Sequence, residues 1–148
     1  KASKGGNIPE SRILFNQYDS EANIIEQQKT GGASQVFIWG YQKSLPIAKI
    51  ENITYTNIPT SLISAVQSAS DSGTENELLS ALTTLRNDPT LVNAIISTYT
   101  YKPLVGISTI TDPKGETITY TYDSFGRLEF VKDKNNHILS ENQYNYKQ

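Results

Sequence analysis

The acidic residues, the single histidine and the aromatic residues are the side chains of this chain that could do chemistry. Two carboxylates facing each other can hydrolyse a glycosidic bond, and a Ser–His–Asp triad would have to use His137, the one histidine. Most of the 15 acidic residues have a structural interpretation, however. The aspartates fall in expected turns or helix caps, where Asp stabilises the backbone; they are Asp19, Asp71, Asp88, Asp112, Asp123 and Asp133. Four glutamates fall on strand faces that we expect to face water, namely Glu26, Glu51, Glu129 and Glu141. We therefore expect no catalytic residues and no cofactor.

Metal-ligating residues are scarce. The chain has no cysteine and one histidine, which excludes Cys-ligated zinc and Cys–His nucleophiles. Residues 133–136 (Asp-Lys-Asn-Asn) could offer oxygen atoms to calcium, but no acidic residue follows closely to complete the site. We expect no metal site, and we expect His137 to face solvent.

The aromatic residues suggest two alternatives, packing between strands or stacking on sugars. The chain has 9 tyrosines and one tryptophan, and a buried tyrosine combines a large apolar area with a hydroxyl that can reach a neighbouring turn. Trp39 and Tyr41 are the candidates for glycan stacking. Nucleic acid is disfavoured as a partner because the net charge is −2 and no Lys/Arg stripe is present.

Length and hydropathy bound the class of protein. At 148 residues the chain is long enough for one compact domain, and no stretch reaches the ~18 apolar residues of a membrane span. The chain contains no methionine and begins at Lys1, so we expect it to be a piece of a longer protein.

Alternating residues in the C-terminal third predict antiparallel strands. In Thr117–Tyr122 the residues Ile118, Tyr120 and Tyr122 share one face and the threonines the other, the pattern of a strand with one packed and one wet face. Similar stretches predict strands at 95–101, 106–111, 127–131 and 137–146. The turn at Asp123–Gly126 has the Asp and Gly typical of short hairpin loops.

The first half of the chain predicts four more strands and a helical insert. The strands are expected at 12–18, 23–29, 35–41 and 46–55. Leu62, Ile63, Val66 and Ala69 recur at helical spacing after Pro59, and Thr74 and Glu77 have the spacing of a capping box before a second helix. We expect the leucines of this helical hairpin to cover one face of the sheet.

These patterns predict a mainly β fold. It is an antiparallel β-meander of hairpin repeats with an inserted amphipathic α-helical hairpin, in one compact domain. We expect a poorly ordered N-terminus at residues 1–11, β-hairpin repeats at 12–56, the helical insert at 57–93 and further hairpin repeats at 94–148.

An internal repeat accompanies the predicted hairpins. Tyr101 and Tyr122 are 21 residues apart, Gly106 and Gly126 are 20 apart, and Asp112 and Asp133 are 21 apart. The segment Tyr18–Ile24 also matches Tyr122–Leu128 position by position. Since one hairpin cannot bury its own apolar face, such units must pack against their neighbours.

The segment Tyr120–Leu128 (YTYDSFGRL) resembles the signature of the YD repeat, the unit of Rhs-type proteins. Residues 98–106 with 110–115 resemble a second copy, and 38–41 leading into 46–50 is similar to the variants in Rhs proteins of the Bacteroidetes. In the resemblance, Tyr18, Asp19, Tyr101, Gly106, Tyr120, Tyr122, Asp123 and Gly126 are the structural residues of the repeat. Two positions depart from it: Ala22 stands where the repeat has Gly, and Lys102 replaces the Asp after Tyr101. Ala22 costs on the order of 1 kcal/mol if that position needs positive φ, unless Asn23 adopts it instead.

The resemblance implies a function as well as a fold. Rhs-type proteins are large bacterial proteins, secreted or displayed on the cell surface, whose hairpins wind into a β-shell. In several relatives the shell encloses a toxic C-terminal domain. The implied partners of this chain are flanking repeats of the same parent chain and a C-terminal toxin domain, and the implied role is structural and non-catalytic. A carbohydrate-binding surface module is the alternative.

Overall fold

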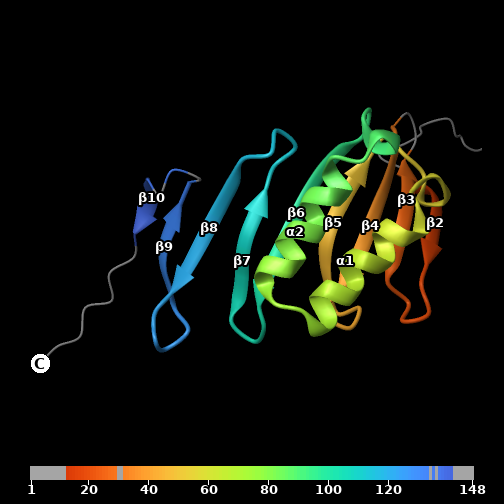
Figure 1. The fold of residues 1–148 in the computed structure, drawn as a ribbon. Helices are drawn as coiled ribbons and strands as arrows, with labels where there is room; N and C mark the ends of the chain where they lie inside the picture. The colour runs from red at the N-terminus through yellow and green to blue at the C-terminus, as the bar shows by residue number, and fades with distance from the viewer. Residues whose placement is uncertain (1–12, 30–31, 134, 136, 142–148) are drawn as a thin grey trace, which may run out of the picture. The chain divides into compact units, whose positions relative to one another are not determined.

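The structure is a computed structural model that describes residues 13–29, 32–133, 135 and 137–141. These residues form nine strands and two α-helices (Figure 1). The chain divides into two compact units, residues 1–96 (unit 1) and residues 97–148 (unit 2). The N-terminal segment 1–11, which we expected to be poorly ordered, lies outside the described residues, as do residues 142–146 of the last expected strand.

Unit 1 contains an antiparallel meander whose strands pair in chain order. They are β2 (Ile13–Tyr18), β3 (Ile24–Lys29), β4 (Ser34–Gly40) and β5 (Leu45–Glu51). The fourth strand was expected to run to Tyr55, but it ends at Glu51. Asn52 has φ 71°, a left-handed conformation that Asn tolerates but that is incompatible with a β-strand, so the strand ends before it. A short 3₁₀ helix follows at Tyr55–Asn57.

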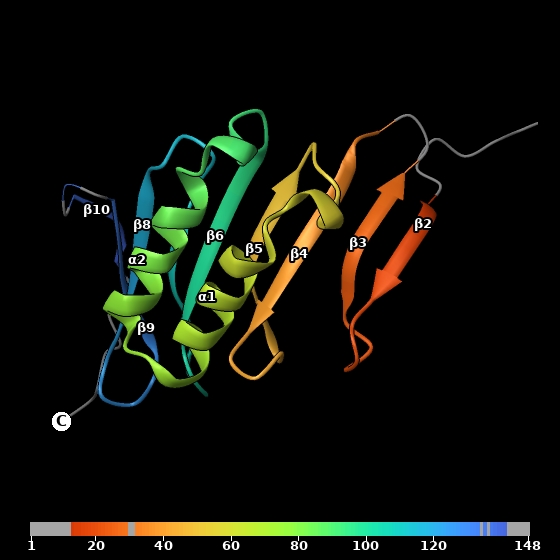
Figure 2. The ribbon, with the colours of Figure 1, turned by 45° about the vertical axis from the view of Figure 1, so that its right-hand side comes forward.

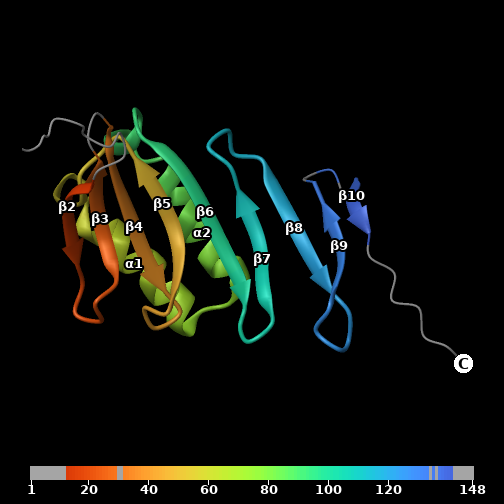
Figure 3. The ribbon, with the colours of Figure 1, turned by 180° about the vertical axis from the view of Figure 1, so that it is seen from behind.

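The helical insert consists of α1 (Thr60–Ser72) and α2 (Glu75–Arg86). The expected capping box is present: the Glu77 amide donates to Thr74 Oγ1 at 3.2 Å, and the Thr74 amide donates to Glu77 Oε1 at 2.8 Å. The two helices pack against each other, and α1 lies on one face of the unit 1 strands, as Figure 2 shows; Figure 3 gives the opposite face. Their apolar stripes complete a core with the strands, made of Val36, Ile38, Ile47, Ala48, Ile50, Ile63, Val66, Leu78, Leu82, Leu85 and Leu91.

Glu26 corrects one expectation about the strand faces. It was expected on a wet face, but it is only 5% exposed, because it lies opposite Val36 on the face of the sheet that carries the core. Its Oε1 accepts a hydrogen bond from the Tyr55 amide at 3.0 Å. The buried carboxylate thereby satisfies a backbone donor at the start of the 3₁₀ helix.

Unit 2 continues with hairpins. Its strands are β6 (Ile95–Lys102, whose first two residues belong to unit 1), β7 (Gly106–Thr111), β8 (Thr117–Tyr122), β9 (Leu128–Lys132) and β10 (Ile138–Glu141). Each pairs antiparallel with the next in chain order. The expected fold class, a β-meander with an inserted helical hairpin, is confirmed.

Threonines of β6 and β7 are buried in unit 2, and the expected division of β8 (residues 117–122) into a packed and a wet face is not observed. Thr100 is fully buried and Thr109 is 6% exposed, and their hydroxyl oxygens are 2.7 Å apart. Thr111 and Thr117 form a similar pair at 2.8 Å. On β8 all six residues are half-buried, so the split into a dry and a wet face is wrong there. Threonine can be buried here because the paired hydroxyls satisfy each other.

Candidate functional site: the repeated hairpin turns

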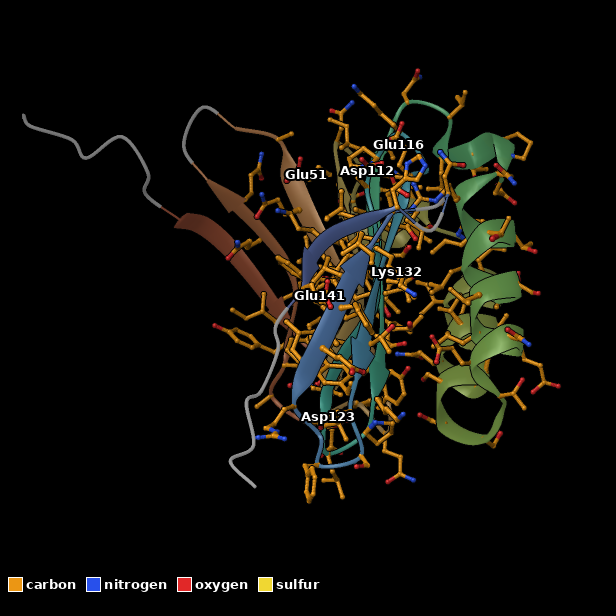
Figure 4. All side chains as sticks on the ribbon, turned by 90° about the vertical axis from the view of Figure 1, so that its left-hand side faces the viewer. Glu51, Asp112, Glu116, Asp123, Lys132 and Glu141 are labelled. Atoms are coloured by element: carbon orange, nitrogen blue, oxygen red, sulfur yellow. The ribbon has the colours of Figure 1, made fainter. Side chains whose placement is uncertain are left out.

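Four hairpins are closed by the same five-residue turn, which begins at Asp19, Asp112, Asp123 or Asp133 and which we call the Asp turn. In each, the Asp Oδ1 accepts hydrogen bonds from the backbone amides two and four residues later, at 2.8–3.0 Å. The Asp amide in turn donates to the carbonyl four residues later, at 2.8–3.0 Å. One carboxylate oxygen thus organises the whole turn, and Figure 4 shows the turns of Asp112 and Asp123 at opposite ends of unit 2.

In the turns that begin at Asp19, Asp123 and Asp133, the second carboxylate oxygen also has a side-chain partner. Asp19 Oδ2 accepts from Asn23 Nδ2 at 3.2 Å, and Asp123 Oδ2 accepts from Arg127 Nε at 3.2 Å. Asp133 Oδ2 lies 3.4 Å from His137 Nδ1, and the His137 side chain is 75% exposed. The donor is each time the side chain four residues after the Asp. These carboxylates are occupied by turn contacts, and no group of three metal-ligating side chains occurs among the described residues.

In the turns that begin at Asp19, Asp112 and Asp123, the fourth residue has a left-handed backbone. Gly115 has φ 87° and Gly126 has φ 79°, and Ala22 adopts φ 66° at the equivalent place. Asn23 therefore does not adopt the left-handed role that would have spared Ala22 the strain. The amide of this fourth residue donates to the Asp carbonyl at 2.9–3.0 Å in all three turns, so the hydrogen bonds hold Ala22 in a conformation that favours glycine.

Exchanging residues at the fourth position should change stability in opposite directions. We expect Ala22→Gly to stabilise the chain by about 0.5 kcal/mol, because glycine removes the left-handed strain but loses more entropy on folding. We expect Gly126→Val to destabilise it by about 1.5 kcal/mol, because a β-branched residue is poorly accommodated at positive φ. Urea denaturation of both variants checks this. A loss of stability in Ala22→Gly would contradict the strain assigned to Ala22.

Three Asp turns have carboxylates with lowered pKa values. For Asp19 and Asp123, partial burial alone would raise the pKa, but backbone hydrogen bonds outweigh it, from Asn23 and Glu21 in one turn and from Arg127 and Phe125 in the other. The charges of Lys43 and Arg127 add to the lowering. For Asp133 the His137 amide is the main cause. Hydrogen bonds to the ionised form favour that form.

The lowered pKa values predict a loss of stability in acid. A folded pKa below the unfolded value near 3.8 means that the unfolded chain binds protons more readily. The contribution is therefore complete above about pH 5 and is lost as the pH falls through 4 and below. Asn can accept the same backbone hydrogen bonds without titrating, so Asp123→Asn should flatten the acid decline of the urea midpoint between about pH 5 and 3. An unchanged decline would show that Asp123 does not contribute.

Tyr122 and Gly106, two residues of the sequence motif, are in contact within unit 2. The Tyr122 hydroxyl donates to the Ile107 carbonyl at 2.7 Å. A Cβ on Gly106 would lie 2.6 Å from that hydroxyl oxygen, so the glycine makes room for the phenol ring. Burial and the neighbouring Tyr120 raise the pKa of Tyr122. Gly106 thus has a steric role, in contrast to Gly126, whose φ is 79°.

The β6–β7 turn lacks the Asp, as the substitution by Lys102 indicated, and closes differently. The Val105 amide donates to the Lys102 carbonyl at 3.0 Å, and Leu104 has φ 66°. With Pro103 before it, this is the geometry of a type II turn, whose third residue is usually Gly or Asn.

The remaining tyrosines of the sequence motif lie at strand positions. Tyr101 is half-buried opposite Ile107, and Tyr120 is half-buried opposite Val131. Tyr18, directly before the first Asp turn, is 55% exposed. The tyrosines therefore differ in how much of the fold they cover.

Trp39 and Tyr41, the candidates for glycan stacking, have different environments. Trp39 is half-buried on β4, and its indole N–H donates to the Ile24 carbonyl at 2.8 Å. Tyr41 is half-buried and begins a left-handed stretch, since Tyr41, Gln42 and Lys43 have φ 52°, 60° and 61°. Only Trp39 thus belongs to the sheet surface.

The left-handed stretch 41–43 is fixed by helix α1 and by the first Asp turn. The Tyr41 amide donates to Ser70 Oγ at 2.9 Å, and the Gln42 amide donates to Asp71 Oδ1 at 2.6 Å. Asn23 Nδ2 donates to the Lys43 carbonyl at 2.7 Å. Together these hydrogen bonds stabilise the left-handed backbone of residues 41–43, which would be unfavourable without them.

Sequence reasoning placed Asp112, Gly115 and Asp133 in the repeat, but it did not recognise their turns as equivalent to the turns that begin at Asp19 and Asp123. The signal was present: an Asp followed three residues later by Gly, Ala or Asn recurs after strands at 19, 112, 123 and 133. The spacing of these aspartates shows that the repeating element in unit 2 is one strand with its turn, which is about half as long as the 20-residue period.

Antiparallel hairpins closed by one recurring turn define a β-hairpin repeat protein. Residues 106–135, which run from β7 to the turn after β9, match the family model described as RHS Repeat. The chain therefore contains an RHS repeat at residues 106–135, and the matched segment includes the Tyr120–Leu128 motif. No curated protein matches the chain. Within the described residues, neither helix has the length and apolarity needed to cross a bilayer.

Proposed function

We propose that the chain is a non-catalytic structural module of a larger exported or cell-surface Rhs-type protein of the Bacteroidetes type. Its hairpins extend a β-shell by pairing with flanking repeats of the same parent chain, and the shell encloses or presents a C-terminal toxin. The observation that carries the proposal is the Asp turn, which recurs with the same hydrogen bonds at Asp112, Asp123 and Asp133 in and beside the matched repeat.

The chemistry of the Asp turn supports an architectural role. Each Asp Oδ1 is hydrogen-bonded to two backbone amides, which leaves that oxygen poorly suited to proton transfer. Because the same turn closes consecutive hairpins, it gives successive units the same geometry, which is what stacking of repeats requires.

The parent protein provides the test. We expect the C-terminal segment expressed alone to be toxic to the host cell, and the parent to be harmless while its repeats are folded. Gly126→Val in the parent should increase protease cleavage of the C-terminal segment, whereas Val92→Ala, at an exposed position of unit 1, should not. A C-terminal segment that is equally accessible in the unaltered parent and in Gly126→Val would contradict enclosure.

Carbohydrate binding is a second candidate function, favoured by one surface of unit 1. Gln27, Gln35 and Glu51 form a cross-strand chain of hydrogen bonds of 2.9 Å each, and Lys49 Nζ lies 3.3 Å from Glu51 Oε2. Alternation along β4 puts half-buried Phe37 and Trp39 on the same face as Gln35. Planar amides beside aromatic rings suit the hydroxyls and the apolar face of a sugar.

Fluorescence of Trp39, the one tryptophan, tests this second candidate. Titration with soluble polysaccharides should shift its emission, and Gln35→Ala should weaken the response. An unchanged emission across neutral and acidic polysaccharides would remove the candidate.

A further inference from the structure

Two neighbouring turns of unit 2 carry apolar side chains that the fold leaves in water. Leu104 in the β6–β7 turn is 107% exposed, and Phe125 in the β8–β9 turn is 74% exposed. Val105, 38% exposed, joins them, since its Cγ1 lies 4.0 Å from the position of a Cβ on Gly126. Both turns lie at the same end of the unit 2 strands (Figure 1). We call Leu104, Val105 and Phe125 the apolar tip.

Leu104 is the least expected of these residues. Its φ of 66° is a conformation that costs a non-glycine residue on the order of 1 kcal/mol, and the third position of this turn prefers Gly or Asn. Because the Leu104 side chain is fully exposed, its burial within the fold gives no stabilisation that would offset this conformational free energy. A strained, exposed leucine is therefore better explained by a contact outside the chain than by folding.

The size of the apolar tip selects the kind of partner. A stable protein interface buries about 800 Å² on each side and uses about 20 or more residues, and three side chains on two turns are far smaller. A fluid bilayer accepts a small apolar projection without a complementary pocket, as it does for other surface-bound apolar groups.

The charged groups of the two turns are compatible with a bilayer surface. Lys102 is exposed. Arg127 is ion-paired with Asp123 at 3.2 Å, and its guanidinium lies 5.2 Å from the centre of the Phe125 ring. With two cations and one carboxylate the turns carry a net charge of +1, and long basic side chains can keep their charge in the headgroup layer while their stems lie against apolar groups.

We propose that the apolar tip inserts into the headgroup–acyl boundary of a phospholipid bilayer. Leu104 and Phe125 enter the apolar layer, and Lys102 and Arg127 remain among the headgroups. The small net charge gives a modest preference for anionic lipid, and apolar burial supplies most of the binding. This surface is independent of the shell-forming role, since it needs neither flanking repeats nor a toxin.

The test uses sedimentation of the 148-residue chain with vesicles of phosphatidylcholine, with and without phosphatidylserine. The chain should partition into both, and Leu104→Asn should lower the partition coefficient about tenfold. Asn is favoured at positive φ, so the same variant should have a urea midpoint at least as high as that of the unaltered chain. Weaker binding together with undiminished stability separates loss of the contact from unfolding.

Two further variants complete the design. Phe125→Ser should weaken partitioning by a similar factor. Val92→Asn, at a residue of unit 1 that is 77% exposed, should leave it unchanged. The proposal is overturned if neither vesicle binds the chain, if Leu104→Asn binds as well as the unaltered chain, or if Leu104→Asn instead converts an oligomer into a monomer, which would identify the tip as a protein contact.

Discussion

Gly40→Ala is expected to destabilise unit 1 by about 3 kcal/mol. An added Cβ would lie 2.9 Å from Ser70 Cβ and 2.8 Å from Ile47 Cδ1, and closer still to Ser70 Oγ. Contacts this short cannot be relieved by a rotamer change of Ser70, so α1 must move away from β4, and overpacking of this kind typically costs 1–3 kcal/mol.

Moving α1 also weakens the contacts that fix the β4–β5 connection. Gln67 Nε2 donates to the Trp39 carbonyl at 2.9 Å, and Ser70 and Asp71 hold the amides of Tyr41 and Gln42. Without them, three consecutive left-handed residues lose the contacts that maintain their conformation. The expected loss therefore lies at the upper end of the range.

Urea denaturation followed by Trp39 fluorescence measures this effect, because Trp39 is adjacent to Gly40. Ser70→Gly, which removes the closest atoms, should relieve part of the clash. The double variant should then cost at least 1 kcal/mol less than the sum of the two single variants. Additive effects would mean that Ser70 does not limit the approach of α1 to β4.

The strands and helices could be predicted from sequence because their signals are local. Gly106–Thr111 and Thr117–Tyr122 were predicted at the bounds observed, since alternation and flanking turn residues define both ends. The capping box of Thr74 and Glu77 was predicted for the same reason, as both partners lie within one helical turn. The strand that ends at Glu51 was predicted to be too long. Asn can adopt either an extended or a left-handed backbone, and contacts outside the local sequence determine that Asn52 is left-handed.

The parts that could not be predicted depend on contacts between distant segments. The burial of Glu26 follows from its place opposite Val36 and from the Tyr55 amide, 29 residues away. The left-handed conformation of residues 41–43 depends on Ser70 and Asp71, and no local feature of Tyr-Gln-Lys favours it. The Asp turn was only partly predicted, because the 20-residue period related Asp112 to Asp133 but did not relate either of them to Asp123, whose turn has the same hydrogen bonds.

Gly106→Ala is expected to destabilise unit 2 by about 2 kcal/mol. The added Cβ would lie 2.6 Å from the Tyr122 hydroxyl oxygen and 3.2 Å from Cζ of the same ring. The ring must move, and its hydrogen bond to the Ile107 carbonyl is then lost or lengthened. Loss of a partly buried hydrogen bond contributes about 1 kcal/mol, and the displaced packing contributes the rest.

Tyr122→Phe separates these two contributions. It removes the oxygen that the Cβ would meet first, so the remaining approach, to Cζ, needs a shift of only a few tenths of an ångström. In that background the cost of Gly106→Ala should fall below about 1 kcal/mol. Native-state hydrogen exchange of peptides from residues 97–132 measures it within unit 2. An equal cost in both backgrounds would mean that Gly106 is needed for its backbone conformation and not for the space that Tyr122 occupies, and the pairing of these two residues would then have no part in the repeat.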